Sequence, residues 1–291
     1  MKPFVPLLLL WLIIAPFNGF SQNKQAAALR RLQGIVTSAD DKLSLAYASV
    51  GLLNKPVGTI ADSAGHFALT LSPENKGDTV RISMVGYLPL MRPVREFENS
   101  GETIVIRLTK KITQLNEVKV SNLFSHAVIV GKQTTGTMIQ ASIIPKGDSA
   151  PTIGAETGFK LHAPRYPAMF DNVNFYVSAN NFKYIKFRLN IYSLKNNLPD
   201  TLLFNKEILV SLNNYKTGWS KIDLTTDALV INADCAVTLQ WVDYNKDMLK
   251  GPQVLMPAGL SFSHINYYRM ASQDKWKTVK GNLSVYVSLR D

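Results

Sequence analysis

The stretch GTIADSAGHFALTL, Gly58 to Leu71, contains a turn signal followed by alternating apolar and polar residues. Successive side chains of an extended chain point to opposite faces, so the alternation predicts a strand with one buried face. That face would carry Phe67, Leu69 and Leu71. His66 falls on the opposite face, while Asp62 and Gly65 stand where a type I turn favours Asp first and Gly fourth. The stretch therefore predicts a turn that leads into a β-strand.

The same alternation recurs along most of the chain, in short runs separated by Gly, Pro, Asn and Asp. No helical period competes with it, so the sequence predicts an all-β protein. The clearest runs are AYASVGLL (46–53), VRISM (80–84), TIVIRL (103–108), YIKFRLNIY (184–192), DCAVTLQWV (234–242) and LSVYVSL (283–289). Residues 121–150 mix short strands with turn residues and are predicted to connect two domains, 32–120 and 151–291.

Five segments of the first domain carry a family resemblance. They are GIVTS (34–38), YASVGLLN (47–54), GTIADSAGHFAL (58–69), DTVRISMVGY (78–87) and LNEVKV (115–120). In this order they resemble the carboxypeptidase regulatory-like domain of exported Bacteroidota proteins, which implies a small seven-stranded sandwich of the transthyretin-like type. The family's structural positions would be Gly58, Asp62, Gly65, Phe67, Gly86 and Tyr87. The resemblance implies turn and core formers at these positions, and no catalyst.

The second domain is predicted to be a larger jelly-roll-like β-sandwich, because its strands follow one another without intervening helices. Its segments IKFRLNIYSL (185–194), YKTGWSKIDL (215–224) and YYRMASQDKW (267–276) resemble the C-terminal half of exported Bacteroidota proteins that carry the first domain. That resemblance implies a β-sandwich fold and no established activity.

The first residues predict export. Lys2 precedes an apolar run from Phe4 to Phe17, and small and polar residues follow it as far as Ser21. The run is shorter than the ~20 residues that a transmembrane helix needs, so residues 1–21 are predicted to be a cleaved signal peptide and 22–31 an N-terminal segment. The expected location is the periplasm, the outer-membrane surface or the exterior, with no membrane-spanning segment left after cleavage.

The net charge indicates the class of binding partner, and the cysteine count indicates whether disulfide bonds stabilise the fold. The chain has 32 Lys and Arg against 21 Asp and Glu, a formal net charge of +11. This excess favours a glycan or an anionic envelope component as partner. The basic residues are scattered rather than clustered, which disfavours nucleic acid. Cys235 is the only cysteine, so no internal disulfide staples the fold, and its phase with Val237 predicts an inert core position. The sequence does not indicate an oligomeric state.

No catalytic residue can be singled out. A zinc carboxypeptidase needs a His-x-x-Glu pair, and none of the four His residues has a Glu at that spacing. The Asp, Ser and His of the opening stretch lie too close together in an extended chain to converge as a triad. One alternative is a hydrolase with a carboxylate-based site in the second domain, using Asp243 or Glu156 near His162. Another is a structural accessory subunit of an outer-membrane complex.

Two groups of residues in the second domain are candidates for binding. Flat aromatic rings beside a cation suit sugar rings, and they predict a ligand site at Trp219, Tyr268, Arg269 and Trp276. The competing interpretation is that these aromatic residues fill the sandwich core. Asp243, Asn245 and Asp247 resemble the opening of a calcium loop. The Gly and Glu that such a loop requires are Met248 and Val254 here, so a polar hairpin turn is the alternative and no cofactor is predicted. Together these features predict an exported, non-enzymatic binding or scaffold protein of the cell envelope.

Overall fold

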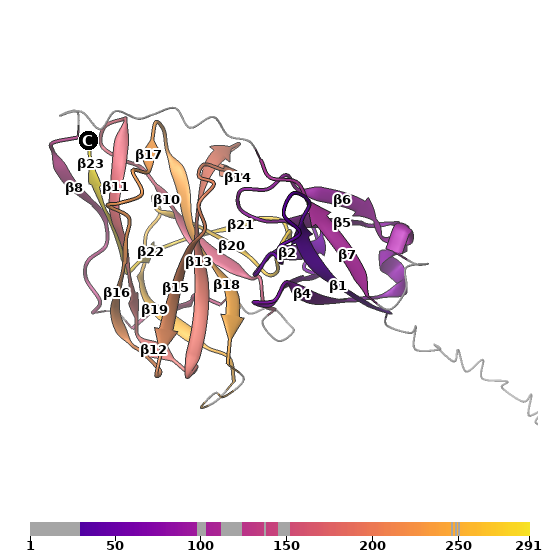
Figure 1. The fold of residues 1–291 in the computed structure, drawn as a ribbon. Coiled ribbons are helices and arrows are strands. Elements are labelled where there is room, and N and C mark those ends of the chain that lie inside the picture. The colour runs from indigo at the N-terminus through magenta and orange to yellow at the C-terminus, as the bar shows by residue number, and fades with distance from the viewer. Residues whose placement is uncertain are drawn as a thin grey trace, which may run out of the picture.

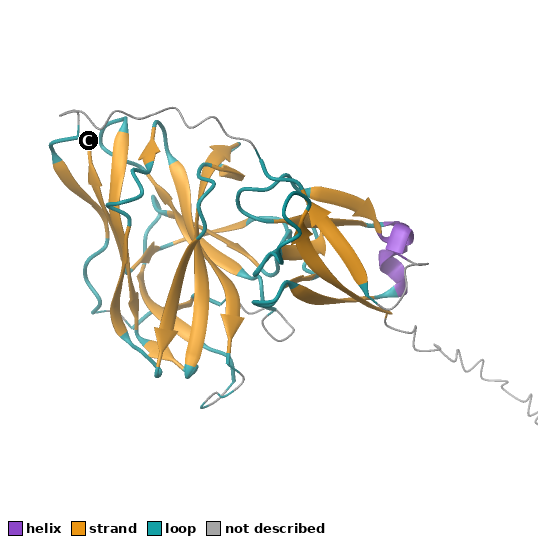
Figure 2. Cartoon of the chain, in the orientation of Figure 1, coloured by secondary structure: helices purple, strands orange, loops and turns teal. Residues whose placement is uncertain are grey.

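The protein is described by a computed structural model that covers residues 30–97, 103–111, 124–136, 138–144, 152–245, 247, 249 and 251–291. The chain forms a smaller and a larger lobe (Figure 1). Almost all regular structure is strand, which confirms the all-β prediction (Figure 2). The helical turns η1 (Pro73–Gly77) and η2 (Val94–Phe97) lie at the end of the smaller lobe that is remote from the larger one. The predicted signal peptide and the segment LNEVKV lie outside the described residues.

The smaller lobe is a sandwich of a three-stranded and a four-stranded sheet. Its strands are β1 (Arg30–Ser38), β2 (Ser49–Leu52), β3 (Gly58–Ile60), β4 (His66–Leu71), β5 (Thr79–Ser83), β6 (Leu90–Pro93) and β7 (Ile104–Leu108). The sheet orders are β4-β1-β7 and β3-β2-β5-β6, and only the β1–β7 pairing among them is parallel. The two sheets enclose one apolar core that includes Val36, Val50 and Leu69.

The opening stretch forms a turn followed by strand β4. The Asp62 carboxylate accepts hydrogen bonds from the backbone N–H groups of Ala64 and His66, each at 2.9 Å. Gly65 has a φ of +83°, a left-handed conformation that favours glycine. Phe67 is buried and His66 is exposed, so the side chains alternate along β4 as the pattern predicts. These bonds give Asp62 and Gly65 backbone roles in the turn.

The larger lobe is a sandwich in which a seven-stranded sheet faces a five-stranded sheet and a four-stranded sheet. Its strands begin with β8 (Ala127–Gly131), β9 (Gln140–Ser142), β10 (Glu156–Leu161), β11 (Ala168–Val177), β12 (Ala179–Asn180), β13 (Tyr184–Lys195), β14 (Leu198–Leu202) and β15 (Ile208–Asn213). They continue with β16 (Gly218–Asp223), β17 (Val230–Ile231), β18 (Cys235–Tyr244), β19 (Val254–Gly259), β20 (Ile265–Arg269), β21 (Lys277–Lys280), β22 (Asn282–Leu283) and β23 (Val285–Arg290). The chain crosses repeatedly between the sheets, as in jelly rolls.

The seven-stranded sheet has an apolar inner face and a polar outer face that is also buried. Inner residues such as Phe187, Leu189 and Trp241 belong to the core of the larger lobe. On the outer face Arg188 is only 2% exposed and Asn190 only 4%. The smaller lobe lies over this face, beside strands β13, β18 and β20 (Figure 1). A buried polar face of this kind must satisfy its groups internally, and it forms one wall of the candidate site.

The core position of Cys235 makes a measurable prediction. Its side chain is fully buried, and burial raises the pKa of the thiol to about 12. Because the thiolate is the nucleophile, we expect iodoacetamide at pH 8 to leave the folded chain unlabelled over hours and to label the urea-unfolded chain within minutes. Mass spectrometry of the two samples checks this. Rapid labelling of the folded chain would contradict the buried position.

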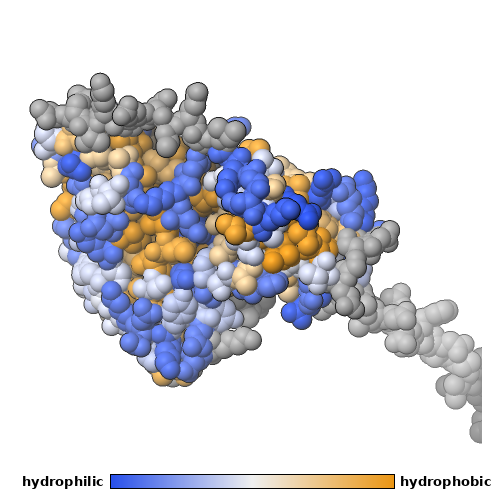
Figure 3. Space-filling view, viewed as in Figure 1, coloured by the Kyte–Doolittle hydropathy of each residue, from blue (hydrophilic) through white to orange (hydrophobic). Residues whose placement is uncertain are grey.

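Among the described residues, no helix is long and apolar enough to cross a membrane. The space-filling view shows a larger lobe that tapers into a smaller one (Figure 3). On the face shown, apolar patches over the larger lobe and next to the boundary are interspersed with hydrophilic residues.

Candidate functional site: a cleft between the two lobes

The loop between β20 and β21 of the larger lobe packs against the smaller lobe. The Ser272 hydroxyl lies 2.9 Å from the carbonyl oxygen of Val50 and 3.0 Å from that of Thr59. A Cβ atom on Gly51 would lie 2.4 Å from the Ser272 carbonyl oxygen, and one on Gly58 would lie 2.6 Å from it. Glycine at these two positions therefore lets the backbone of the loop approach the β2–β3 hairpin closely.

Gln273 follows in the same loop, and its hydrogen bonds fix the orientation of the loop against the smaller lobe. The backbone N–H of Asn54 donates to the Gln273 carbonyl oxygen at 2.8 Å, and the Gln273 side-chain amide donates to the Ser83 hydroxyl at 2.8 Å. The guanidinium of Arg81 donates to the Gln273 side-chain oxygen. Gln273 is buried, so these bonds satisfy polar groups that water does not reach.

Tyr47 provides a second contact between the lobes. Its carbonyl oxygen accepts a hydrogen bond from Arg188 at 2.7 Å, and its hydroxyl accepts one from Lys186 at 2.7 Å. Its ring packs with Ile60 of the smaller lobe and Val242 of the larger one. The polar and apolar contacts together hold the lobes in a defined relative position.

These contacts border a cleft with a volume of about 560 Å³. Arg81 and the turn that contains Gly86 and Tyr87 line it from the smaller lobe. The outer face of the seven-stranded sheet and the β20–β21 loop, including Arg269 and Trp276, line it from the larger lobe. Its volume falls in the range of roughly 300–1,000 Å³ that is typical of small-molecule sites.

A buried ion pair supports the wall of this cleft. Glu156, at the start of β10, is fully buried and accepts a hydrogen bond from the Arg269 Nε atom at 2.9 Å. Its other oxygen accepts from Asn190 at 2.9 Å and from the Thr238 hydroxyl. Burial and the Glu156 charge together raise the pKa of Tyr192, whose hydroxyl lies 3.5 Å from this carboxylate. Glu156 therefore holds Arg269 in place and has no free lone pair directed at the cleft.

A second ion pair lies further along the same sheet face. Arg188 donates to the Glu207 carboxylate at 2.6 and 2.9 Å and to the Gln240 side-chain oxygen at 3.1 Å. With its bond to Tyr47, the guanidinium is satisfied on both lobes. Arg188 therefore acts as a structural link beneath the cleft.

An aromatic ring completes the cleft. The guanidinium carbon of Arg269 lies 4.6 Å from the centre of the Trp276 ring, which is cation–π geometry. The Tyr192 ring meets the same indole edge-on at 5.7 Å between ring centres. Trp276 is half-buried, so part of the indole remains open to a ligand in the cleft.

Comparison with known proteins identifies the smaller lobe. Residues 32–120 match the family described as CarboxypepD_reg-like domain. The smaller lobe is a CarboxypepD_reg-like domain. No curated protein matches the chain. Among solved structures, one similar chain is the cysteine protease and lectin-like domains of Cwp84, a surface layer associated protein of Clostridium difficile, with 9% identity and a TM-score of 0.36. That match covers 48% of this chain and 32% of the other, so the chain spans about a third of that structure.

Three of the predicted motif positions of the CarboxypepD_reg-like domain contribute to the cleft. Gly58 gives space to Ser272, as described above. Gly86 has a φ of +80°, and its carbonyl oxygen accepts a hydrogen bond from the Lys111 N–H at 2.8 Å. Tyr87 follows it in a turn that lines the cleft. Asp62, Gly65 and Phe67 instead belong to the turn and core around β4.

The structure brings together two of the four predicted ligand residues. Arg269 and Trp276 stack in the cleft. Tyr268 is adjacent to Arg269 on β20, so its side chain points to the opposite face of the sheet. Trp219 lies on β16 in the other sheet, where its ring meets Tyr176 and Tyr286 at 5.4 and 5.0 Å between ring centres. Trp219 is 36% exposed and does not contribute to the cleft.

The three predicted calcium ligands bind different partners. Asp243 accepts a hydrogen bond from the Tyr47 hydroxyl at 3.3 Å, which places it at the contact between the lobes. The Asn245 side chain accepts from the Asp247 N–H at 2.9 Å, and the Asp247 carboxylate lies 3.5 Å from Lys183. Among the described residues, no group of three or more His, Cys, Asp and Glu side chains is arranged to hold a metal ion. Met248 of the predicted loop lies outside the described residues.

Glu156 and His162 do not share a site. Glu156 begins β10 and His162 directly follows its last residue, so with a rise of ~3.3 Å per residue roughly 20 Å separates their backbones. His162 instead bonds the Asp234 carboxylate at 2.8 Å. Burial raises the pKa of Asp234, but hydrogen bonds from His162 and neighbouring donors outweigh it and lower the value to about 2. The pairing of Glu156 with His162 as a hydrolytic centre is therefore wrong.

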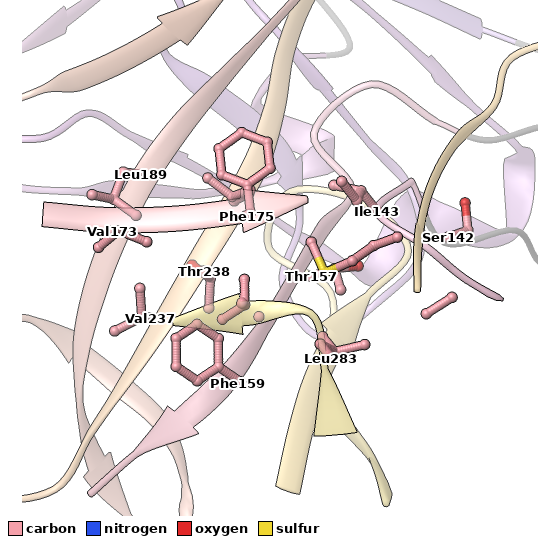
Figure 4. Close-up of a pocket in the computed structure, with 15 residues that line it drawn as sticks. Ser142, Ile143, Thr157, Phe159, Val173, Phe175, Leu189, Val237, Thr238 and Leu283 are labelled. Atoms are coloured by element: carbon pink, nitrogen blue, oxygen red, sulfur yellow. The ribbon is translucent and has the colours of Figure 1, made fainter. Parts of the chain in front are cut away.

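A second cavity lies inside the larger sandwich (Figure 4). It is lined mainly by apolar side chains, including Phe159, Phe175 and Leu189, and its volume is about 20 Å³. Thr157 borders it, and the Thr157 hydroxyl has no hydrogen-bond partner among the described residues. The space is about the size of one water molecule and is too small for an organic ligand.

Proposed function

We propose that this protein is an exported, non-enzymatic binding protein that holds a glycan in the cleft between its lobes. A non-enzymatic binding role is compatible with the CarboxypepD_reg-like domain. The observation that carries the proposal is the cleft itself, which combines a ligand-sized volume with Trp276, Arg269 and several polar side chains. The predicted signal peptide supports a place in the cell envelope or outside the cell.

The composition of the cleft favours a sugar over an apolar ligand. A half-buried indole offers a flat apolar face for the C–H groups of a sugar ring, and it stands beside hydrogen-bonding groups such as Asn190 and Ser83. Small-molecule sites commonly combine an apolar surface with a few fixed polar groups that orient the ligand. The two lobes would then act together, with the CarboxypepD_reg-like domain supplying one wall rather than serving as a spacer.

Glu156, the buried acid behind the cleft wall, is placed for a structural role rather than a hydrolytic one. A general acid or base must reach the bond that is broken, within hydrogen-bonding distance or through one water molecule. Glu156 is instead occupied by Arg269, Asn190 and Thr238. Its bonds are those of a group that fixes the shape of the cleft wall.

Glycan-array binding by the full chain, with Trp276→Ala and Trp219→Ala as matched variants, tests the proposal. We expect Trp276→Ala to weaken binding about 10-fold, since loss of an aromatic contact of roughly 1.4 kcal/mol changes affinity by that factor. Trp219→Ala should bind as the wild type does, because Trp219 lies outside the cleft. Circular dichroism confirms that each variant is folded.

Two results would overturn the proposal. The absence of any bound glycan would remove the glycan as ligand. Loss of binding in Trp219→Ala together with full binding in Trp276→Ala would move the site to the aromatic cluster of Tyr176, Trp219 and Tyr286 and away from the cleft.

A further inference from the structure

Arg81 is a partly buried cation that lacks an acidic partner. It lies on β5 and lines the cleft from the smaller lobe. Within the part of the chain that the structure describes, its side chain donates only to the neutral side chain of Gln273. Among the described residues, no carboxylate lies within ion-pair distance of its guanidinium. Since a guanidinium carries several N–H donors, most of its hydrogen-bonding capacity is unused.

The other two arginines of the cleft differ from Arg81 in this respect. Arg188 is paired with Glu207, and Arg269 is paired with Glu156. Burial and the nearby charge of Arg269 both lower the pKa of Arg81. Arg81 and Arg269 both line the cleft, and among the described residues only Arg269 of these two is paired with a carboxylate.

The acids that line the cleft are engaged elsewhere. The buried Asp274 carboxylate accepts hydrogen bonds from the N–H groups of Lys275 at 2.8 Å and Met270 at 3.2 Å, within its own loop. Asp200 is exposed and accepts a hydrogen bond from the Thr201 hydroxyl at 3.0 Å. Neither acid neutralises Arg81. The Arg81 guanidinium is therefore available to an anionic ligand.

We propose that the glycan of the cleft is acidic and that its carboxylate binds Arg81, next to Arg269, while a sugar ring contacts Trp276. The inference rests on the proposed function and names the class of its ligand. A planar guanidinium accepts a carboxylate through two parallel hydrogen bonds, a geometry that an ammonium does not offer. The carboxylate would also face the positive charge of Arg269, which lines the same cleft. A partly buried charge that finds an acidic partner only in the complex favours acidic ligands over neutral ones.

The test compares acidic oligosaccharides with their neutral counterparts. The probes are oligomers of galacturonic, glucuronic and mannuronic acid and sialylated oligosaccharides, each beside its carboxyl-reduced form, together with sulfated neutral oligosaccharides. Calorimetric titration of the full chain should give about 10- to 100-fold tighter binding for at least one acid than for its reduced form, the range of one charge-assisted hydrogen-bonded contact. Arg81→Gln should abolish this preference, so that the acid and its reduced form bind that variant with equal affinity. Arg81→Lys should keep only part of the preference for the acid, because lysine has the positive charge but lacks the planar guanidinium that binds a carboxylate through two parallel hydrogen bonds.

Arg92→Gln is the matched control. Arg92 lies in the same lobe, is exposed and pairs with Glu96, outside the cleft. Its removal should therefore change neither the affinity for the acidic oligosaccharide nor the affinity for its reduced form. Arg81→Gln also loses the hydrogen bond from Arg81 to Gln273, so we expect a cooperative thermal unfolding transition like that of the wild type at a slightly lower temperature. This readout separates loss of binding from loss of fold.

The possible results distinguish a failure of the acidic preference from a failure of the proposed glycan binding. Equal binding of acidic and reduced forms, with dependence on Trp276, would overturn the acidic preference and leave the proposed function standing. A preference for acidic sugars that persists in Arg81→Gln would also overturn the proposed binding of a carboxylate at Arg81. Tighter binding of the sulfated neutral oligosaccharides than of the carboxylate-bearing ones would overturn it too. Failure to bind any probe, acidic or neutral, together with an empty glycan array, would remove both proposals.

Discussion

Replacement of Glu156 by Ala is expected to lower the free energy of unfolding by about 3–5 kcal/mol, the usual cost of removing one partner of a buried ion pair. The change leaves the Arg269 guanidinium buried without its counter-charge and removes an acceptor from Asn190 and Thr238. Urea denaturation followed by circular dichroism measures the effect. The slope of the transition should stay unchanged if the folded and unfolded states keep their compactness.

Glu96→Ala is the control for that experiment. Glu96 pairs with Arg92 at 3.4 Å, and both side chains are about half exposed. Exposed pairs of this kind contribute roughly 0–1 kcal/mol. A loss for Glu156→Ala as small as the loss for Glu96→Ala would show that Glu156 does not hold the cleft wall.

Gly58→Ala is expected to weaken the contact between the lobes. The new Cβ would lie 2.6 Å from the Ser272 carbonyl oxygen and 2.7 Å from its hydroxyl oxygen, so the β20–β21 loop must move. Overpacking at a close contact costs about 1–3 kcal/mol. Because the same loop carries Trp276 to the cleft, glycan binding should weaken about 10-fold or more, and proteases should cleave the loop faster.

Gly77→Ala provides the matched glycine control. Gly77 belongs to the same lobe, and a Cβ there would have no neighbour within 4 Å. It should unfold and bind like the wild type. If Gly58→Ala behaves as Gly77→Ala does, the close approach of Ser272 to the β2–β3 hairpin plays no part in positioning the cleft.

Alternation along the chain was sufficient to predict strands such as β4, β13 and β18 and the side that their residues face. Phe67 and His66 lie on opposite faces of β4, and Phe187 and Trp241 lie in the core of the larger lobe. The sequence did not indicate that the polar face of β13 is covered. Strand period assigns a residue such as Arg188 to a face, but what packs on that face depends on contacts between distant segments.

The candidate site was partly predictable. Arg269 and Trp276 lie close together in the sequence, at the two ends of one loop, and the structure brings them together. Trp219 has the same chemistry but lies in the other sheet, a separation that composition cannot reveal. Arg188, a charged residue between Phe187 and Leu189 near the middle of a long strand, was a usable signal of a buried polar network. Arg81 had no comparable signal, because its importance arises only from the absence of a nearby acid.

Binding of an acidic glycan in the cleft between the lobes can be seen directly in a crystal structure of the full chain with the tightest acidic oligosaccharide from the titrations. We expect density for the sugar in the cleft, with its carboxylate within hydrogen-bonding distance of Arg81 and a ring against Trp276. Sugar density on Tyr176, Trp219 and Tyr286 with an empty cleft, or a sugar in the cleft whose carboxylate points away from Arg81, would contradict it.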